Sequence, residues 1–130
     1  MGIGIDICKI SRFSKLFAKG VSWQERFAKR ILHKTELLEW SLILNEQKEN
    51  YNSTATAKWF ATRWSTKEAA FKAVQPEHKV YMNEMMLKHS SNGQPVLFID
   101  RKGENPLSVP VSLSHEDDYV VAVAIYMPCV

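Results

Sequence analysis

Residues 54–74 read TATAKWFATRWSTKEAAFKAV and predict one long helix, around which the rest of the fold is expected to pack. Thr54 follows a polar break at residues 50–53, and Pro76 limits the helix at its other end. Apolar side chains recur at helical spacing along one seam, at Ala57, Phe60, Ala61, Trp64 and Phe71. The rest of the chain must therefore supply a surface on which this seam is buried.

Strands and shorter helices are predicted on both sides of the long helix. Residues 2–7 alternate strictly and predict a strand with three isoleucines on one face, and Ser11 is expected to cap a helix through Ala18. Further helices are expected at residues 23–32 and 35–48, and strands at 85–88, 96–100, 109–114 and 119–126, with Asn92-Gly93 in a hairpin turn. The predicted fold class is α+β, an antiparallel sheet curled around one long helix, in a single domain spanning residues 1–130.

The composition excludes several classes of protein. With 130 residues, 45% hydrophobic and 24% charged, the chain suits one compact domain that buries a real core. The longest apolar run, residues 120–127, is too short to span a bilayer, so no membrane partner is expected. Cys8 and Cys129 have no CxxC spacing and are expected to be unpaired thiols, with one long-range disulfide left open. We expect an intracellular protein of the cytoplasm or the mitochondrial matrix.

Positive charge is concentrated in the first half of the chain. Residues 1–75 hold 13 Lys/Arg against 7 Asp/Glu, whereas residues 76–130 hold 4 against 7. The strip from residue 9 to residue 34 carries eight basic residues, and only Glu25 opposes them. Such a field favours an acidic partner or a phosphorylated ligand, although a solvated face without a partner is the other interpretation.

Glu68 breaks the apolar seam of the long helix. A carboxylate that faces a core costs free energy unless it is paired or binds a cation. Lys72 lies one turn later, in the favourable Glu-before-Lys order, so a helix-surface ion pair worth about 0.3–0.5 kcal/mol is one interpretation. A carboxylate that binds a cation is the other.

Asp6 is a second carboxylate in an unusual place, because aspartate is disfavoured inside a strand. It shares its strand face with Gly2 and Gly4, where a backbone or a ligand can approach closely. Mg²⁺ binds through one or two carboxylates together with water and phosphate oxygens. Asp6 and Glu68 are therefore candidate Mg²⁺ ligands, although Asp6 could instead cap the turn after its strand.

Residues 112–115, Ser-Leu-Ser-His, end a strand of Val and Leu with hydroxyls and an imidazole. A serine hydrolase is disfavoured because there is no G-x-S-x-G turn and because adjacent strand residues point to opposite faces. A P-loop is excluded because there is no GxxxxGK sequence. His115 therefore either has a structural role or hydrogen-bonds a phosphate.

Four motifs occur in order along the chain: Gly2-Ile-Gly-Ile-Asp6-Ile, Phe27-Ala-Lys-Arg30-Ile-Leu with Glu36, Arg63-Trp-Ser-Thr-Lys67-Glu68-Ala-Ala-Phe-Lys72-Ala73, and Val111-Ser-Leu-Ser-His115. Together they resemble the short, single-domain holo-acyl-carrier-protein synthases of the 4′-phosphopantetheinyl transferase superfamily, over almost the whole chain. The matching family patterns are G-[IV]-G-[IVL]-D-[IVL], F-x-x-R-[IV]-[LF]…E, R-[FW]-[AS]-x-K-E-A-x-x-K-A and S-[IL]-[ST]-H. Two departures stand out, a longer region between Glu36 and Arg63 and Thr66 in place of the usual alanine.

The resemblance implies an activity and a set of site residues. Such enzymes move the phosphopantetheine arm of coenzyme A onto a serine of an acyl carrier protein and release adenosine 3′,5′-bisphosphate. The implied Mg²⁺ ligands are Asp6 and Glu68, and the implied catalytic residues are Glu68, which helps to deprotonate the serine directly or through a metal-bound water, and Lys72. The implied coenzyme A contacts are Arg63, Lys67, Lys72 and His115, and the implied carrier-docking residues are Arg12, Arg26, Phe27 and Arg30. The resemblance also implies a homotrimer with sites between subunits, and no nucleic-acid partner.

Two other functions stay open at this point. A metal-dependent nuclease would use Asp6, Glu68 and the basic half, but such folds usually place Glu and Lys two residues apart on a strand. Here the spacing is four residues on a predicted helix. A noncatalytic helix-on-sheet module would use the basic strip to bind an acidic protein, and would leave the two carboxylates unexplained.

Overall fold

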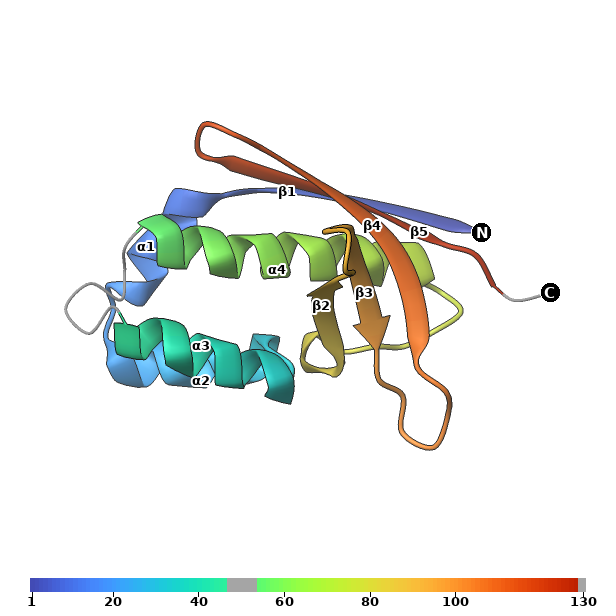
Figure 1. Cartoon of the computed structure of the whole chain (residues 1–130), viewed down its shortest axis with the longest axis horizontal. Coiled ribbons are helices and arrows are strands. Elements are labelled where there is room, and N and C mark those ends of the chain that lie inside the picture. The colour runs from blue at the N-terminus through green and yellow to red at the C-terminus, as the bar shows by residue number, and fades with distance from the viewer. Residues whose placement is uncertain (47–53, 129–130) are drawn as a thin grey trace.

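The structure is a computed structural model, and it describes residues 1–46 and 54–128 (Figure 1). Its elements follow in the order β1 (Gly2–Lys9), α1 (Ile10–Phe17), α2 (Val21–Ile31), α3 (Lys34–Glu46), α4 (Thr54–Val74), the 3-10 helix η1 (Met82–Glu84), β2 (Met85–His89), β3 (Pro95–Ile99), β4 (Leu107–Glu116) and β5 (Tyr119–Tyr126). The predicted end of the third helix at Lys48, the polar break at 50–53 and Cys129 lie outside the described residues. Among the described residues, no helix is both long enough and apolar enough to cross a bilayer.

The sheet has five antiparallel strands in the order β1-β5-β4-β3-β2. The long strand β4 changes partner along its length, because residues 107–110 pair with β3 and residues 111–116 pair with β5. This offset lets the sheet curl, with β1 and β5 running along α4 and the short strands β2 and β3 lying near its C-terminal end (Figure 1). The predicted fold class, an antiparallel sheet curled around one long helix, is confirmed.

Strand β1 packs against α4 so closely that only glycine fits at two positions. A Cβ atom on Gly4 would lie 1.8 Å from the backbone carbonyl oxygen of Ala69, and one on Gly2 would lie 1.8 Å from that of Ala73. Both alanines are buried in the core that α4 shares with the sheet. The glycines beside Asp6 therefore bring a strand against the backbone of the helix that carries Glu68.

A second, aromatic core forms where α1, α2 and α3 meet the first half of α4. Phe13, Phe17 and Phe60 are fully buried, and the ring of Trp40 lies 5.4 Å from those of both Phe17 and Phe60. On the figure this is the end of the molecule where α1 connects β1 to α2 (Figure 1). The two cores hold opposite halves of α4, so the middle of that helix is supported from both ends.

The prediction that Ser11 caps the helix after β1 is wrong. The helix begins at Ile10, and Ser11 lies within it. Its backbone N–H and its hydroxyl donate to the two carboxylate oxygens of Asp118, at 3.0 and 2.5 Å, and the Ile10 N–H donates to the Asp118 carbonyl. The acceptors at this helix start thus come from the β4–β5 hairpin, 107 residues away along the chain.

Candidate active site

Asp6 lies on the face of β1 that looks toward α4, where Ser65 and Lys72 reach it. The Ser65 hydroxyl donates to Asp6 Oδ2 at 3.0 Å. The ammonium nitrogen of Lys72 lies 3.8 Å from Asp6 Oδ1 and donates to the carbonyl of Ile5 at 2.9 Å. Since β1 is an edge strand, these groups lie at an open margin of the sheet.

Glu68 stands beside Asp6 and is poorly neutralised. Partial burial raises the pKa of the Glu68 carboxyl, and the nearby negative charge of Asp6 raises it further, against weaker opposite effects of Lys72 and Arg12. Within residues 1–46 and 54–128, no cationic group lies within 4.0 Å of its carboxylate. The predicted Glu68–Lys72 surface ion pair is therefore not formed, because Lys72 turns to Asp6 and Ile5.

Two neighbouring carboxylates with so little positive charge around them fit a divalent cation. Among the described residues there is no group of three or more His, Cys, Asp or Glu side chains that could hold a metal ion. Mg²⁺ does not need such a group, because water and substrate phosphate complete its coordination. Asp6 and Glu68 thus fit a Mg²⁺ that binds together with a phosphorylated substrate.

Arg12 lies at the rim of this pair. Its guanidinium carbon is 5.2 Å from the ring centre of Trp64, and its charge lowers the pKa of Glu68. Arg12 follows Ser11 directly, so the bonds between Ser11 and Asp118 fix the turn of α1 from which it projects. The structure therefore brings one predicted docking residue close to the carboxylate pair.

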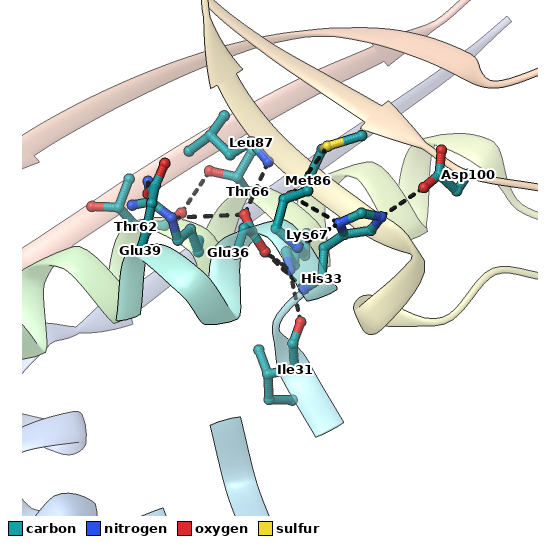
Figure 2. Close-up of polar contacts among 12 residues, drawn as sticks. Ile31, His33, Glu36, Glu39, Thr62, Thr66, Lys67, Met86, Leu87 and Asp100 are labelled. Carbon is teal, nitrogen blue, oxygen red and sulfur yellow. Dashed lines mark hydrogen bonds and ion pairs between the residues drawn. The ribbon is translucent and has the colours of Figure 1, made fainter. Parts of the chain in front are cut away.

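Lys67 lies in a buried cluster with Glu36 (Figure 2), and Arg63 reaches the same carboxylate. Lys67 is fully buried and donates to Glu36 Oε1 at 2.5 Å and to the Ile31 carbonyl at 2.7 Å. Arg63 Nε lies 3.7 Å from Glu36 Oε2, and its guanidinium carbon is 3.7 Å from the ring centre of Trp59. Neighbouring helix residues project about 100° apart, so Lys67 and Glu68 face different surroundings. The placement of Lys67 leaves it no exposed donor for a coenzyme phosphate, contrary to the expectation from the motif.

His115 lies beside Thr62 of α4, away from Glu68. Its Nε2 atom is 3.3 Å from the Thr62 hydroxyl, and burial together with the charge of Lys58 lowers its pKa. Thr62 and Glu68 are separated by about 120° around the helix axis and about 9 Å along it. One copy of the chain therefore does not bring His115 to the carboxylate pair.

The predicted docking residues Arg26, Phe27 and Arg30 lie on α2, and we call their side of that helix the docking face. Phe27 stacks on Trp23 and Trp64, with ring centres 5.0 and 6.0 Å apart, while Arg26 and Arg30 are exposed. A groove of about 590 Å³ continues from Phe27 and Arg30 toward Trp64, Tyr81 and Met82. Basic and aromatic groups thus lead from α2 to Trp64, one turn of α4 before Glu68.

Sequence reasoning placed Glu36 in a motif but gave it no role, and the structure shows it at the centre of the buried cluster. Its side chain is buried and accepts hydrogen bonds from the backbone N–H groups of His33 and Leu87 as well as from Lys67. Its position in the sequence could have indicated one of these bonds, because a Glu at the third residue of a helix often accepts a hydrogen bond from the backbone N–H of the residue before that helix. Its link to Lys67, 31 residues away, has no local signature.

Comparison with known proteins agrees with this arrangement. The model of the 4′-phosphopantetheinyl transferase superfamily matches residues 2–124. The chain is 44% identical over 129 residues to a Schizosaccharomyces pombe protein assigned as a holo-[acyl-carrier-protein] synthase, covering 98% of this chain and 96% of the relative. It is 33% identical over 134 residues to the holo-[acyl-carrier-protein] synthase of Buchnera aphidicola, covering 97% and 96%.

A solved structure supports the same relationship. The holo-(acyl-carrier-protein) synthase from Bacillus anthracis, in complex with CoA (3′,5′-ADP), is similar with a TM-score of 0.67 and 26% sequence identity, covering 95% of this chain and 92% of that chain. The similarity therefore extends over the whole fold and includes both the β1 motif and the α4 motif. The chain belongs to the holo-[acyl-carrier-protein] synthases, enzymes of the 4′-phosphopantetheinyl transferase superfamily.

Proposed function

We propose that this enzyme transfers 4′-phosphopantetheine from coenzyme A to a serine of an apo acyl carrier protein, with Mg²⁺, and releases adenosine 3′,5′-bisphosphate. The observation that carries the proposal is the poorly neutralised pair Asp6–Glu68 beside Lys72. The similar structure from Bacillus anthracis, which is in complex with CoA (3′,5′-ADP), supports the choice of coenzyme. A noncatalytic binding module or a nuclease gives no account of the family relationship.

In the proposed reaction, Glu68, Lys72 and Asp6 have separate roles. Glu68 accepts the proton of the serine hydroxyl, a role that suits a carboxylate whose pKa is raised above its usual range. The serine oxygen then forms a bond to the phosphorus that carries the pantetheine arm, and the bond from this phosphorus to the adenosine bisphosphate oxygen breaks. Lys72 neutralises the charge on the pyrophosphate and can protonate the leaving phosphate. A Mg²⁺ ion held by Asp6 and Glu68 would supply electrostatic stabilisation of the phosphate oxygens.

A single assay tests this function. The protein is mixed with coenzyme A, Mg²⁺ and an apo carrier protein, and the carrier is then weighed by mass spectrometry. We expect the mass gain of one phosphopantetheine group, and its loss when EDTA removes the metal. Absence of the gain across several carriers would overturn the proposed transferase, and binding without the gain would support a noncatalytic module.

The α2 docking face is proposed to bind the acidic carrier protein, as Arg26 and Arg30 are exposed on it. Arg30→Glu should raise the KM for the carrier about tenfold, since one like-charge contact at an interface costs about 1–2 kcal/mol. The affinity for coenzyme A should be unchanged. The matched control is Lys88→Glu, an exposed reversal on β2 away from α2. Equal losses of carrier and coenzyme affinity would contradict the docking assignment.

A homotrimer with sites between subunits is proposed as the active form. The outer face of β1 exposes Ile3, Ile5 and Ile7, each about 60% accessible, and they pair with Ile125, Val123 and Val121 of β5. Such a contiguous apolar face is typical of a surface that another protein covers. A second copy could also bring its His115 toward the carboxylate pair, which one copy does not do.

Native mass spectrometry of the purified protein tests the oligomer, and a trimer is the expected species. Ile5→Arg should dissociate it and reduce transfer, because a charge is placed in the apolar face. Val96→Arg on β3, a half-buried position outside the β1–β5 face, controls for a general effect of an added charge on folding. A fully active monomer would contradict the proposal.

A further inference from the structure

The strongest unassigned feature is the buried pair of Lys67 and Glu36, at the corner between α2 and α3 (Figure 2). The Lys67 side chain is 0% exposed and the Glu36 side chain is 3% exposed, with 2.5 Å between Nζ and Oε1. Neither group reaches the carboxylate pair at Asp6. The mechanism of transfer therefore makes no direct use of them.

The charge of each side chain lies at a helix end where a charge of that sign is favourable. Lys67 donates to the carbonyl of Ile31, the last residue of α2, where helix carbonyls lack internal partners and positive charge is favourable. Glu36 is the third residue of α3 and accepts from the N–H of His33, where negative charge is favourable. The pair thus closes both helix ends at the corner between residues 31 and 34.

The same pair ties this corner to the rest of the fold. Glu36 Oε2 accepts from the backbone N–H of Leu87 on β2 at 3.0 Å. The His33 ring, buried at the corner, accepts from the Thr35 N–H through Nδ1 and contacts Asp100 through Nε2 at 2.6 Å (Figure 2). Lys67 thus bonds directly to the end of α2 and the start of α3. Glu36 links this pair to β2, and His33 links the same corner to the residue after β3.

The position of this lysine along the chain gives the pair a functional consequence. Lys67 immediately precedes Glu68, and Ile31 immediately follows Arg30 of the docking face. A single hydrogen bond, 2.7 Å long, therefore joins the helix that would hold the carrier to the helix turn that carries the proposed base. Any shift of α2 along α4 would have to break it.

We propose that Lys67 and Glu36 are positioning residues, which hold the α2 docking face at the distance from Glu68 that lets a docked carrier serine reach the coenzyme. This inference rests on the proposed function and deepens it. A buried ion pair is a poor device for stability alone, because apolar groups of the same volume often serve as well. Its directional bonds instead specify one arrangement of the packed helices. In reactions that depend on alignment, a misplacement of about 1 Å can cost about a hundredfold in rate.

The test removes both charges of the pair together, so that neither is left unpaired in the interior. Arg63, which also faces Glu36, keeps its ion pair with Glu39 at 3.2 Å. In the double variant Glu36→Gln/Lys67→Met, side-chain volume is kept and the bond to the Ile31 carbonyl is lost. Transfer is assayed at a temperature at which circular dichroism shows the variant fully folded. We expect kcat/KM for the carrier to fall about tenfold or more, through a higher carrier KM, a lower kcat or both, whereas the equilibrium affinity for coenzyme A without carrier is unchanged.

Two further variants make the test decisive. Thr66→Val removes a buried hydroxyl that bonds to Thr62 within α4, so it perturbs the same helix turn without touching α2, and its kcat/KM for the carrier should stay at the wild-type value. Glu36→Gln alone keeps the Lys67 bond to Ile31 and should lower kcat/KM for the carrier less than the double variant does. If the double variant does not fold, Lys67→Arg, which keeps a cation beside Glu36 but alters the bond to Ile31, is compared with Thr66→Val in the same assay, and a loss confined to Lys67→Arg supports the proposal.

Three outcomes would overturn the inference. An unchanged kcat/KM for the carrier in the folded double variant would make the pair purely structural. A loss of coenzyme affinity with an unchanged carrier KM would place Lys67 at the coenzyme instead. An equal fall in Thr66→Val would show a general effect of perturbing α4. In each case the wild-type enzyme still modifies the carrier, which separates these outcomes from a failure of the proposed function.

Discussion

Two charged clusters on α4 differ in how completely their carboxylates are neutralised. Glu36 is buried and receives three hydrogen bonds and an ion pair, from His33, Lys67, Leu87 and Arg63. Glu68 is only partly buried, and its pKa is raised by that burial and by the negative charge of Asp6. Lys67 and Glu68 are consecutive residues, yet the first completes a closed cluster and the second belongs to an open one.

The closed cluster around Glu36 holds helices together, whereas the open cluster around Glu68 is suited to bind a cation. The buried pair of Lys67 and Glu36 is inaccessible to a ligand, and its hydrogen bonds specify the packing of helices. A carboxylate pair with too little positive charge around it gains free energy when a cation and a substrate arrive. Substitutions in the two clusters should therefore have different consequences for stability and for transfer.

Lys67→Met should cause the largest loss of stability, about 3–5 kcal/mol, because it leaves Glu36 as a buried carboxylate without its closest cation. Urea unfolding at pH 7 measures the loss. The matched control is Lys72→Met on the same helix, where the lysine is half exposed and the expected change is below about 1 kcal/mol. Similar changes in both variants would contradict the distinction between a closed and an open cluster.

Glu68→Gln should abolish transfer, with a loss of about 10²–10⁴-fold, because it removes the proposed base and a proposed metal ligand. The midpoint of thermal unfolding should be equal or higher, because an under-neutralised charge is removed. Mass spectrometry of the carrier and a thermal melt measure the two effects. Glu104→Gln, an exposed acid paired with Arg101, should keep activity. A clear drop in stability with activity retained would make Glu68 a structural partner.

Gly4→Ala should cost about 1–3 kcal/mol, because the added Cβ would lie 1.8 Å from the Ala69 carbonyl and would push β1 off α4. Transfer should fall as well, since Asp6 moves with the strand. Gly103→Ala, where no atom lies within 4 Å of the added Cβ, should cost less, about 1 kcal/mol for its positive φ alone. Chemical unfolding ranks the two, and the reverse order would refute the close approach of strand and helix.

The smallest expected effect is a pH dependence. Because the folded-state pKa of Glu68 is raised, the folded protein holds this proton more tightly than the unfolded chain does. The contribution of Glu68 to stability therefore falls as pH rises from its unfolded pKa through its folded pKa. The stability advantage of Glu68→Gln over the wild type should accordingly be small at pH 4 and larger at pH 7, by urea unfolding. A constant difference would show that the environment of Glu68 does not disfavour its charge.

The secondary structure was largely predictable because its signals are local. The alternation in residues 2–7, the Asn92-Gly93 turn and the seam of residues 54–74 each predict an element that the structure contains. The start of α1 was predicted wrongly because its acceptor, Asp118, lies on a distant hairpin. A capping rule considers only residues close in sequence, and Asp118 comes close to Ser11 only when β5 pairs with β1.

The site was predictable only in part. Asp6 and Glu68 could be singled out because a carboxylate is unusual inside a strand or in the apolar seam of a helix. Lys72 could be singled out because it lies four residues after Glu68. The structure brings these three side chains together. Arg63 and Lys67 share their motif, but motif membership does not say which way a side chain points. The structure turns both toward Glu36.

Periodicity, turn residues and motifs are properties of short stretches of chain, so they are enough to predict the elements, their order and the family. The division of the charges on α4, with Lys67 in a buried cluster and Glu68 at an open margin, depends instead on packing. The physical reason is that the free energy of a charge depends on what surrounds it in space. For Lys67 those surroundings come from α2, α3 and β2, brought together only by packing.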